Sequence, residues 1–190
     1  MTKTRQMLKN LVLAAMFLAM GFVLPFLTGQ IQQIGNMLLP MHIPVLLCGL
    51  ICGWKYGLFV GAVLPLMRSF FFGMPPIYPT AIAMAFELAA YGLTVGLLFS
   101  RARWQCIRSL YRCLILAMLS GRAVWGVAQV LLLELGENGF TLVAFLSGAF
   151  LNAIPGIILQ LILIPAIMLA LDRTHLVPFR NSGTHIIHHT

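Results

Sequence analysis

Three charged side chains lie inside long apolar runs of this sequence: Arg68, Glu87 and Arg122. Glu87 falls in the first half of "AIAMAFELAAYGLTVGLLF", residues 81–99, a run long enough to cross a bilayer. A charge at such a depth costs at least ~2.5 kcal/mol unless it faces a partner or a polar cavity. Two arginines against one carboxylate leave a surplus positive charge, which favours a pocket for a negatively charged or zwitterionic small molecule.

A purely structural alternative exists for the same residues. Glu87 and one arginine could neutralise each other as an ion pair between two helices, with no ligand involved. Trp125 and Gln129 follow Arg122 on one face of a predicted helix. Such a stripe can hydrogen-bond the edge of a ligand and stack on its apolar body, although ordinary packing also accounts for an aromatic residue at this spacing.

The connections between the apolar runs supply further candidates. Tyr78 lies among three prolines in "GMPPIYPTA", residues 73–81, which is either a rigid rim facing a ligand or a simple helix stop and start. The polar segment 29–39 includes Asn36 and could serve as a lid. His42 lies between two prolines and is interpreted as an interfacial or capping residue. The predicted substrate-binding residues are Asn36, Arg68, Tyr78, Glu87, Arg122, Trp125, Gln129 and Asn152.

The composition identifies the class of protein that carries these side chains. Of the 190 residues, 61% are hydrophobic and 8% are charged, and the mean hydropathy is +0.97, so the chain is an integral membrane protein. Its net charge of +8 lies in short segments that flank apolar runs, unlike the clustered basic face of a nucleic-acid-binding protein. The sequence contains no recognisable catalytic constellation, nucleotide-binding loop or metal motif. We therefore expect no enzyme, no cofactor and no metal.

Apolar segments bounded by proline, glycine and charge predict the fold. The expected fold class is an all-α integral membrane protein, a bundle of six transmembrane helices. Residues 1–175 form a single transmembrane domain, and residues 176–190 form a cytoplasmic C-terminal tail. The predicted spans are about 8–28, 40–54, 56–73, 79–100, 107–134 and 141–171.

Basic residues predict the orientation of the spans. Ten of the twelve Lys and Arg residues lie at the two chain ends or in the connections after spans two and four, and the other three connections have none. The basic side is cytoplasmic by the positive-inside rule, so both termini are cytoplasmic. At ~1.5 Å per residue, five predicted polar residues then share a layer ~8–18 Å from the outer ends of their helices. They are Arg68, Glu87, Arg122, Gln129 and Asn152.

The first span carries a pattern that favours a protein partner. In "AAMFLAMG", residues 14–21, Ala15 and Ala19 are four residues apart, and small side chains at this spacing let another helix approach closely. Three further features accompany this pattern: a short basic N-terminus, six spans in 190 residues, and the block "LLPMHIPVLLCGLICGWKYGLFVGAVLPLMRSFFFGMPPIYP". Because of these four features, the chain resembles, over nearly its whole length, the substrate-binding S components of energy-coupling factor (ECF) transporters, the bacterial vitamin importers.

That resemblance implies a function and a set of partners. S components bind a vitamin or related micronutrient from outside with high affinity, and they dock onto a transmembrane coupling protein and two cytoplasmic ATPase subunits. The whole assembly is an ABC importer in the bacterial cell membrane. The docking surface on the first helix of the family maps onto Ala15 and Ala19. Because the surplus arginine favours an anion, we expect pantothenate, niacin or folate as the substrate ahead of cationic thiamine.

Two other function classes stay open at this point. One is an autonomous small secondary carrier or channel for an organic anion, which would work without ATPase subunits. The other is a membrane enzyme that uses Glu87 and His42.

Overall fold

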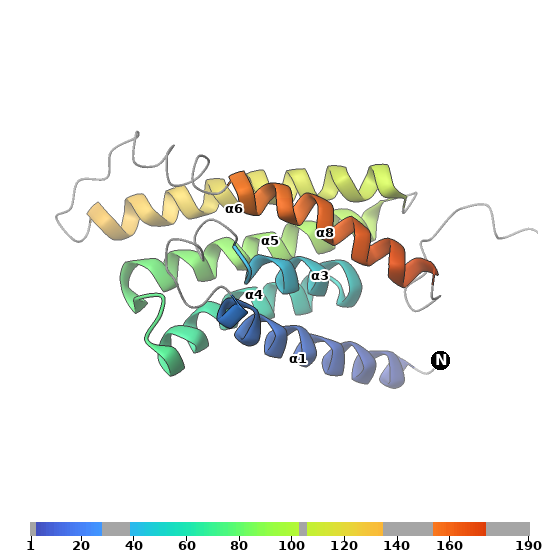
Figure 1. The fold of residues 1–190 in the computed structure, drawn as a ribbon, viewed down its shortest axis with the longest axis horizontal. Helices are drawn as coiled ribbons and strands as arrows, with labels where there is room; N and C mark the ends of the chain where they lie inside the picture. The colour runs from blue at the N-terminus through green and yellow to red at the C-terminus, as the bar shows by residue number, and fades with distance from the viewer. Residues whose placement is uncertain (1–2, 28–38, 103–105, 135–153, 174–190) are drawn as a thin grey trace, which may run out of the picture.

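The computed structural model describes residues 3–27, 39–102, 106–134 and 154–173, and the regular structure in these ranges is helical (Figure 1). A long helix begins the chain, a short helix is joined to the next one by a single residue, and a π-helical turn leads into the helix that carries Glu87. The elements are α1 Lys3–Leu27, α3 His42–Cys52, α4 Trp54–Phe72, η1 Ile77–Ala81, α5 Ile82–Arg101, α6 Ile107–Glu134 and α8 Ile154–Arg173.

Among the described residues, five helical segments are long and apolar enough to cross a membrane: α1, α4, α5 together with η1, α6 and α8. Helix α3 is apolar but has only 11 residues. At 1.5 Å per residue it is about 16 Å long, whereas the hydrocarbon core of a bilayer is about 30 Å thick. The prediction of an all-helical membrane protein is confirmed. The prediction of six spans is not, because the helix in the second span, residues 40–54, is too short to cross alone.

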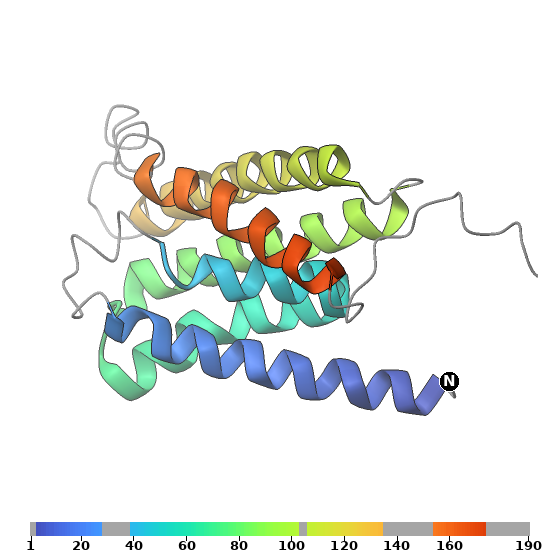
Figure 2. The ribbon, with the colours of Figure 1, turned by 45° about the vertical axis from the view of Figure 1, so that its right-hand side comes forward.

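The helices run back and forth along one long axis (Figures 1 and 2). We call the end at which α1, α4 and α6 finish and α5 begins the distal end. Helices α3 and α8 run away from the distal end, and α8 crosses α3 and α6 obliquely and contacts both. The first residue of α3, His42, lies beside Glu87 in the second turn of α5, and Glu87 contacts Arg122 in the middle of α6.

Helix α3 lies at the centre of the core. Each of its residues except Ile51 is buried. Leu46 and Leu50 pack with α5, α6 and α8 on one side, while Val45 and Cys48 pack with α1 and α4 on the other. A helix that is apolar all round suits a position enclosed by other helices, which explains why the segment is short and yet continuously apolar.

Helices α3, α4 and α5 approach one another through a set of glycines that we call the glycine seam: Gly49, Gly57, Gly61, Gly92 and Gly96. A Cβ atom at Gly49 would lie 2.7 Å from the carbonyl oxygen of Gly92, and one at Gly57 would lie 2.7 Å from the Cα atom of Gly49. Both distances are far below van der Waals contact, so backbone meets backbone here. Small residues allow this close packing of membrane helices. Gly53, with a φ of 95°, makes the one-residue joint between α3 and α4.

Helix α1 lies at the edge of the bundle against α3 and α4. Gly21 faces inward, because a Cβ atom there would meet the side chain of Leu64 in α4. Ala15 and Ala19 are exposed. The pair of small residues predicted to dock a partner thus lies on a surface of α1 that the described residues leave uncovered.

Candidate substrate-binding site

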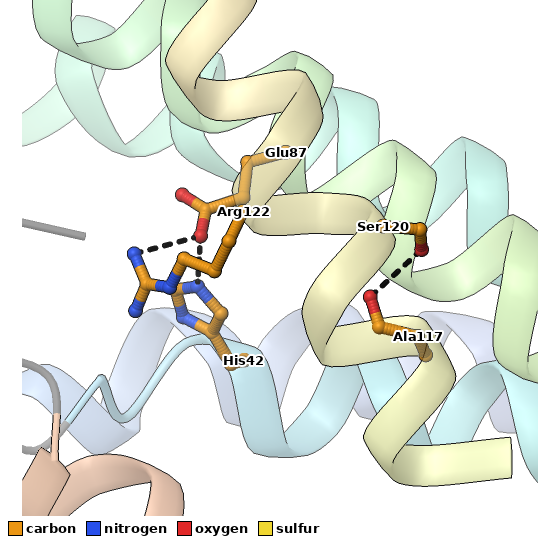
Figure 3. Close-up of polar contacts among 5 residues, drawn as sticks. All are labelled: His42, Glu87, Ala117, Ser120 and Arg122. Carbon is orange, nitrogen blue, oxygen red and sulfur yellow. Dashed lines mark hydrogen bonds and ion pairs between the residues drawn. The ribbon is translucent and has the colours of Figure 1, made fainter. Parts of the chain in front are cut away.

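Glu87 of α5 is contacted from two other helices (Figure 3). Its Oε1 atom lies 3.0 Å from an Nη1 atom of Arg122 in α6 and 3.4 Å from Nε2 of His42 at the start of α3. All three residues are buried: Glu87 and His42 are 1% exposed and Arg122 is 5% exposed. An ionised carboxylate only accepts hydrogen bonds, so Nε2 of His42 donates in this contact. The structure therefore joins Glu87 and Arg122 as an ion pair and adds a histidine to it.

A fourth buried polar residue, Gln160 of α8, is also 1% exposed. Four apolar residues, one on each helix, belong to a single core cluster. Each polar residue lies four positions, or about one helical turn, from one of them, on the side nearer the distal end. The pairs are His42 with Leu46, Glu87 with Tyr91, Arg122 with Met118, and Gln160 with Ile164. We call the four polar residues the polar layer. It closes the distal side of the core formed by α3, α5, α6 and α8.

The polar layer has more hydrogen-bonding atoms than it uses internally. In the described part of the chain, four buried side-chain nitrogens have no hydrogen-bond partner: Nδ1 of His42, Nε and Nη2 of Arg122, and Nε2 of Gln160. A buried polar atom left unsatisfied costs about 1–3 kcal/mol, and more if it is charged. Such atoms are rare in native structures. The three on Arg122 and Gln160 are N–H donors, whereas Nδ1 of a neutral His42 that donates from Nε2 is an acceptor.

On α5, α6 and α8, the described residues one turn to the distal side of the polar layer are small. One further turn along the same helix faces stand Ala83 of α5, Gly126 of α6 and Gly156 of α8, all of them buried. They place very little side-chain volume beside Arg122 and Gln160. The first turn of α3 begins at the same depth, so the positive end of its helix dipole adds to the charge of Arg122.

Arg68 lies apart from the polar layer, on the face of α4 that meets α1. An Nη1 atom donates a hydrogen bond of 3.1 Å to the carbonyl oxygen of Phe22, and the guanidinium carbon lies 5.4 Å from the ring centroid of Phe26 and 5.5 Å from that of Phe72. This is the C-terminal end of α1, where the helix dipole favours a cation. The charge of Arg68 is therefore compensated locally. The surplus positive charge expected from the sequence, that of the second arginine, therefore does not lie beside Arg122. Ligand binding by Arg68 stays a prediction.

The remaining predicted residues occupy different positions. Gln129 is buried on α6, two turns to the distal side of Arg122, and Trp125 is half-buried between them. Tyr78 is exposed, and its hydroxyl donates to the carbonyl oxygen of Leu132, which ties η1 to the end of α6. Asn36 and Asn152 lie outside the described residues, as does most of the proposed lid, so their roles stay predictions.

Sequence reasoning missed two members of the polar layer. The interpretation of His42 as an interfacial or capping residue does not describe its contact with Glu87 or its burial inside the bundle. Gln160 was overlooked, although it is the one polar residue in "IPGIILQLILIPAIMLAL", residues 154–171. That isolation was the available signal, because a lone amide in an apolar helix is expected to face the interior of a bundle.

The family model for the substrate-specific component of ECF transporters matches residues 9–168, a range that contains the complete polar layer and the glycine seam. No curated protein and no solved structure matches the chain significantly.

Proposed function

The chain belongs to the substrate-specific components of ECF transporters, and from this premise we propose that its polar layer binds the transported molecule. Members of this family are transporter subunits and not enzymes, and they act together with an ECF module of membrane and ATPase subunits. The substrate we propose is a vitamin or related micronutrient with an anionic or zwitterionic form, such as pantothenate, niacin or folate. It is captured without chemical change and handed on to the module.

One observation supports an acidic ligand most strongly. Nη1 of Arg122 is engaged by Glu87, whereas Nε and Nη2 are unpaired. These two nitrogens form one edge of the planar guanidinium, and a carboxylate fits that edge with two parallel hydrogen bonds. Nε2 of Gln160 supplies a further donor. In this proposal Glu87 orients the guanidinium by holding Nη1, and the ligand occupies the opposite edge.

The other proposed contacts surround this anchor. Gln129 and Trp125, on α6, lie to the distal side of Arg122, where they can hydrogen-bond and stack against the body of the ligand. Asn36, Tyr78 and Asn152 complete the proposed set at the distal end. We also propose that this end faces the outside of a bacterial cell and that both termini are cytoplasmic, because the basic connections lie at the opposite end.

Docking to the ECF module is proposed at the exposed Ala15 and Ala19. Ala15→Trp and Ala19→Trp should leave ligand binding by the isolated protein unchanged and abolish uptake by the assembled transporter, because a bulky side chain prevents close helix approach. Met16→Trp is a matched control, since Met16 is exposed on α1 one residue away and faces about 100° round the helix. Loss of ligand binding in either alanine variant with normal assembly would contradict the assignment.

Mass spectrometry of the purified subunit tests the proposed function. The protein, purified without its partners, should carry a small acid that is released on denaturation. The same acid should bind tightly again to the refolded, ligand-free protein. A bound cation such as thiamine would contradict the anionic class. Uphill transport by the isolated protein, with no association with ATPase subunits on coexpression, would favour the autonomous carrier instead.

A further inference from the structure

The polar layer contains one titratable group beyond its ion pair. Glu87 and Arg122 together carry no net charge, and His42 contacts the same carboxylate oxygen from the other side (Figure 3). A second positive charge on His42 would leave this buried cluster with a net charge of +1, which is costly away from water. A neutral ring on His42 avoids that cost. With its proton on Nε2, toward Glu87, such a ring has a lone pair on the unpartnered Nδ1.

Binding of an anion reverses this balance. A carboxylate on the free edge of Arg122 gives the cluster two negative charges against one positive charge. The neutral ring of His42, which lies beside the guanidinium in Figure 3, then offers a lone pair where the ligand offers only acceptors. A proton on Nδ1 removes both problems, because it restores a net charge of zero and turns Nδ1 into a donor.

We propose that the polar layer takes up one proton on Nδ1 of His42 when it binds an anion, so that ligand and proton enter the site together. The proton comes from the medium, and no covalent bond of the ligand changes. This inference rests on the proposed function, since it requires an anionic ligand at Arg122. Histidine suits the task because it is the side chain that most readily exchanges a proton near neutral pH.

The surroundings of His42 leave few competing groups. Helix α5 presents Glu87 and Tyr91, whose ring centroid lies 5.1 Å from that of the imidazole, and α6 presents Arg122 through Glu87. On α4, Arg68 is turned toward Phe22 of α1. The other charged residues on the helices around α3 whose side chains the structure describes are at its far end or beyond: Lys3, Arg5, Lys9, Lys55, Arg101, Arg108, Arg112, Asp172 and Arg173.

Proton uptake makes the affinity depend on pH. By linkage, a ligand that brings a proton binds more tightly as the pH falls, by up to about tenfold per pH unit while the free site is mostly neutral and the complex mostly protonated. The carboxylates of pantothenate, nicotinate and folate are ionised throughout the neutral range, so any proton taken up is bound by the protein.

Isothermal titration calorimetry tests the proposal directly. Pantothenate, nicotinate and folate are titrated in turn into the purified full-length protein at pH 8, in phosphate and in Tris, whose different ionisation enthalpies report the protons exchanged. We expect the bound acid to carry close to one proton into the complex. His42→Gln, which keeps a donor for Glu87 but lacks a titratable ring, should bind with no proton uptake. Lys9→Gln, which removes a charge near the far end of α3, should behave as the unmodified protein.

The possible failures are distinguishable. Tight binding of an acid with no proton uptake, or uptake that persists in His42→Gln, would overturn the coupling and leave the proposed function intact. If none of the three acids and no copurified acid binds, the anionic class fails and the coupling fails with it. The unmodified protein gives a second result should the variant not fold. Its affinity should weaken several-fold to about tenfold from pH 7 to pH 8, and a constant affinity would overturn the proposal.

Discussion

The glycine seam and the polar layer are neighbouring regions of one bundle, and they use the same helices in opposite ways. In the seam, α3 and α5 touch through backbone atoms at Gly49 and Gly92, with no side chain between them. One to two turns nearer the distal end, the same helices hold His42 and Glu87 3.4 Å apart, with side-chain nitrogens of the layer left unpaired. The rigid region fixes the helix spacing, and the polar region is thereby held in a geometry that its own hydrogen bonds do not satisfy.

This difference assigns separate tasks to the two regions. Close backbone packing leaves the seam no freedom to adjust, so substitutions there should act on stability. The polar layer is expensive to bury and incompletely satisfied, which suits a site that a ligand completes. The predictions below test this separation, beginning with the largest expected effect.

Glu87→Ala should cost about 3–5 kcal/mol of stability, because it leaves the guanidinium of Arg122 buried without a counter-charge. Unfolding in detergent by heat or denaturant, followed by the fraction of monodisperse protein, measures the loss. Glu87→Gln is the milder comparison, since it keeps the shape and an acceptor for Arg122. If Glu87→Ala were as stable as the parent protein, the polar layer would not be the costly buried cluster described above.

Gly92→Ala should lower stability by about 1–3 kcal/mol and leave the ligand affinity of the folded fraction nearly unchanged. The added methyl group would collide with backbone atoms of Gly57 in α4, which cannot move away as a flexible side chain could. Ser100→Thr is the control, because it adds a methyl group at an exposed position of the same helix. A Gly92→Ala protein of normal stability but weak binding would reverse the tasks assigned to the two regions.

Arg68→Met should have the smallest effect: a loss of about 1 kcal/mol in stability and less than about threefold in affinity. The variant removes a hydrogen bond to Phe22 and two cation–π contacts, but it also removes a buried charge that had to be compensated. Parallel calorimetry and thermal unfolding would show the two effects. An affinity loss of tenfold or more would place Arg68 in the binding site, as its sequence position predicts.

The sequence predicted the helical membrane fold because long apolar runs and flanking charges are strong, local signals. It also identified Glu87 and Arg122, since a charge inside an apolar run is conspicuous. The pairing of Glu87 with Arg122 was harder to predict from the sequence, because it depends on the rotation and depth of each helix. The short length of α3 could not be read from residues 40–54, since an enclosed half-length helix and a spanning one are equally apolar.

His42 and Gln160 show the limit most clearly. His42 lies between two prolines, a context typical of a helix start at an interface, and only the depth at which α3 begins puts it beside Glu87. Gln160 joins the layer because α8 crosses over α3 and α6. Both facts are tertiary, and no spacing within one segment reveals them.

The double variant Glu87→Gln with Arg122→Met tests the central claim most directly, because it keeps the layer electrically neutral and removes the guanidinium edge. If Glu87 and Arg122 form only a structural pair, this protein should fold and bind its ligand as the parent does. If Arg122 holds an anionic group of the ligand, it should fold and lose about 2–5 kcal/mol of binding free energy, which is at least about 30-fold in affinity. Titration calorimetry with the copurified acid gives that number. A stable double variant with the affinity of the parent protein would contradict the account.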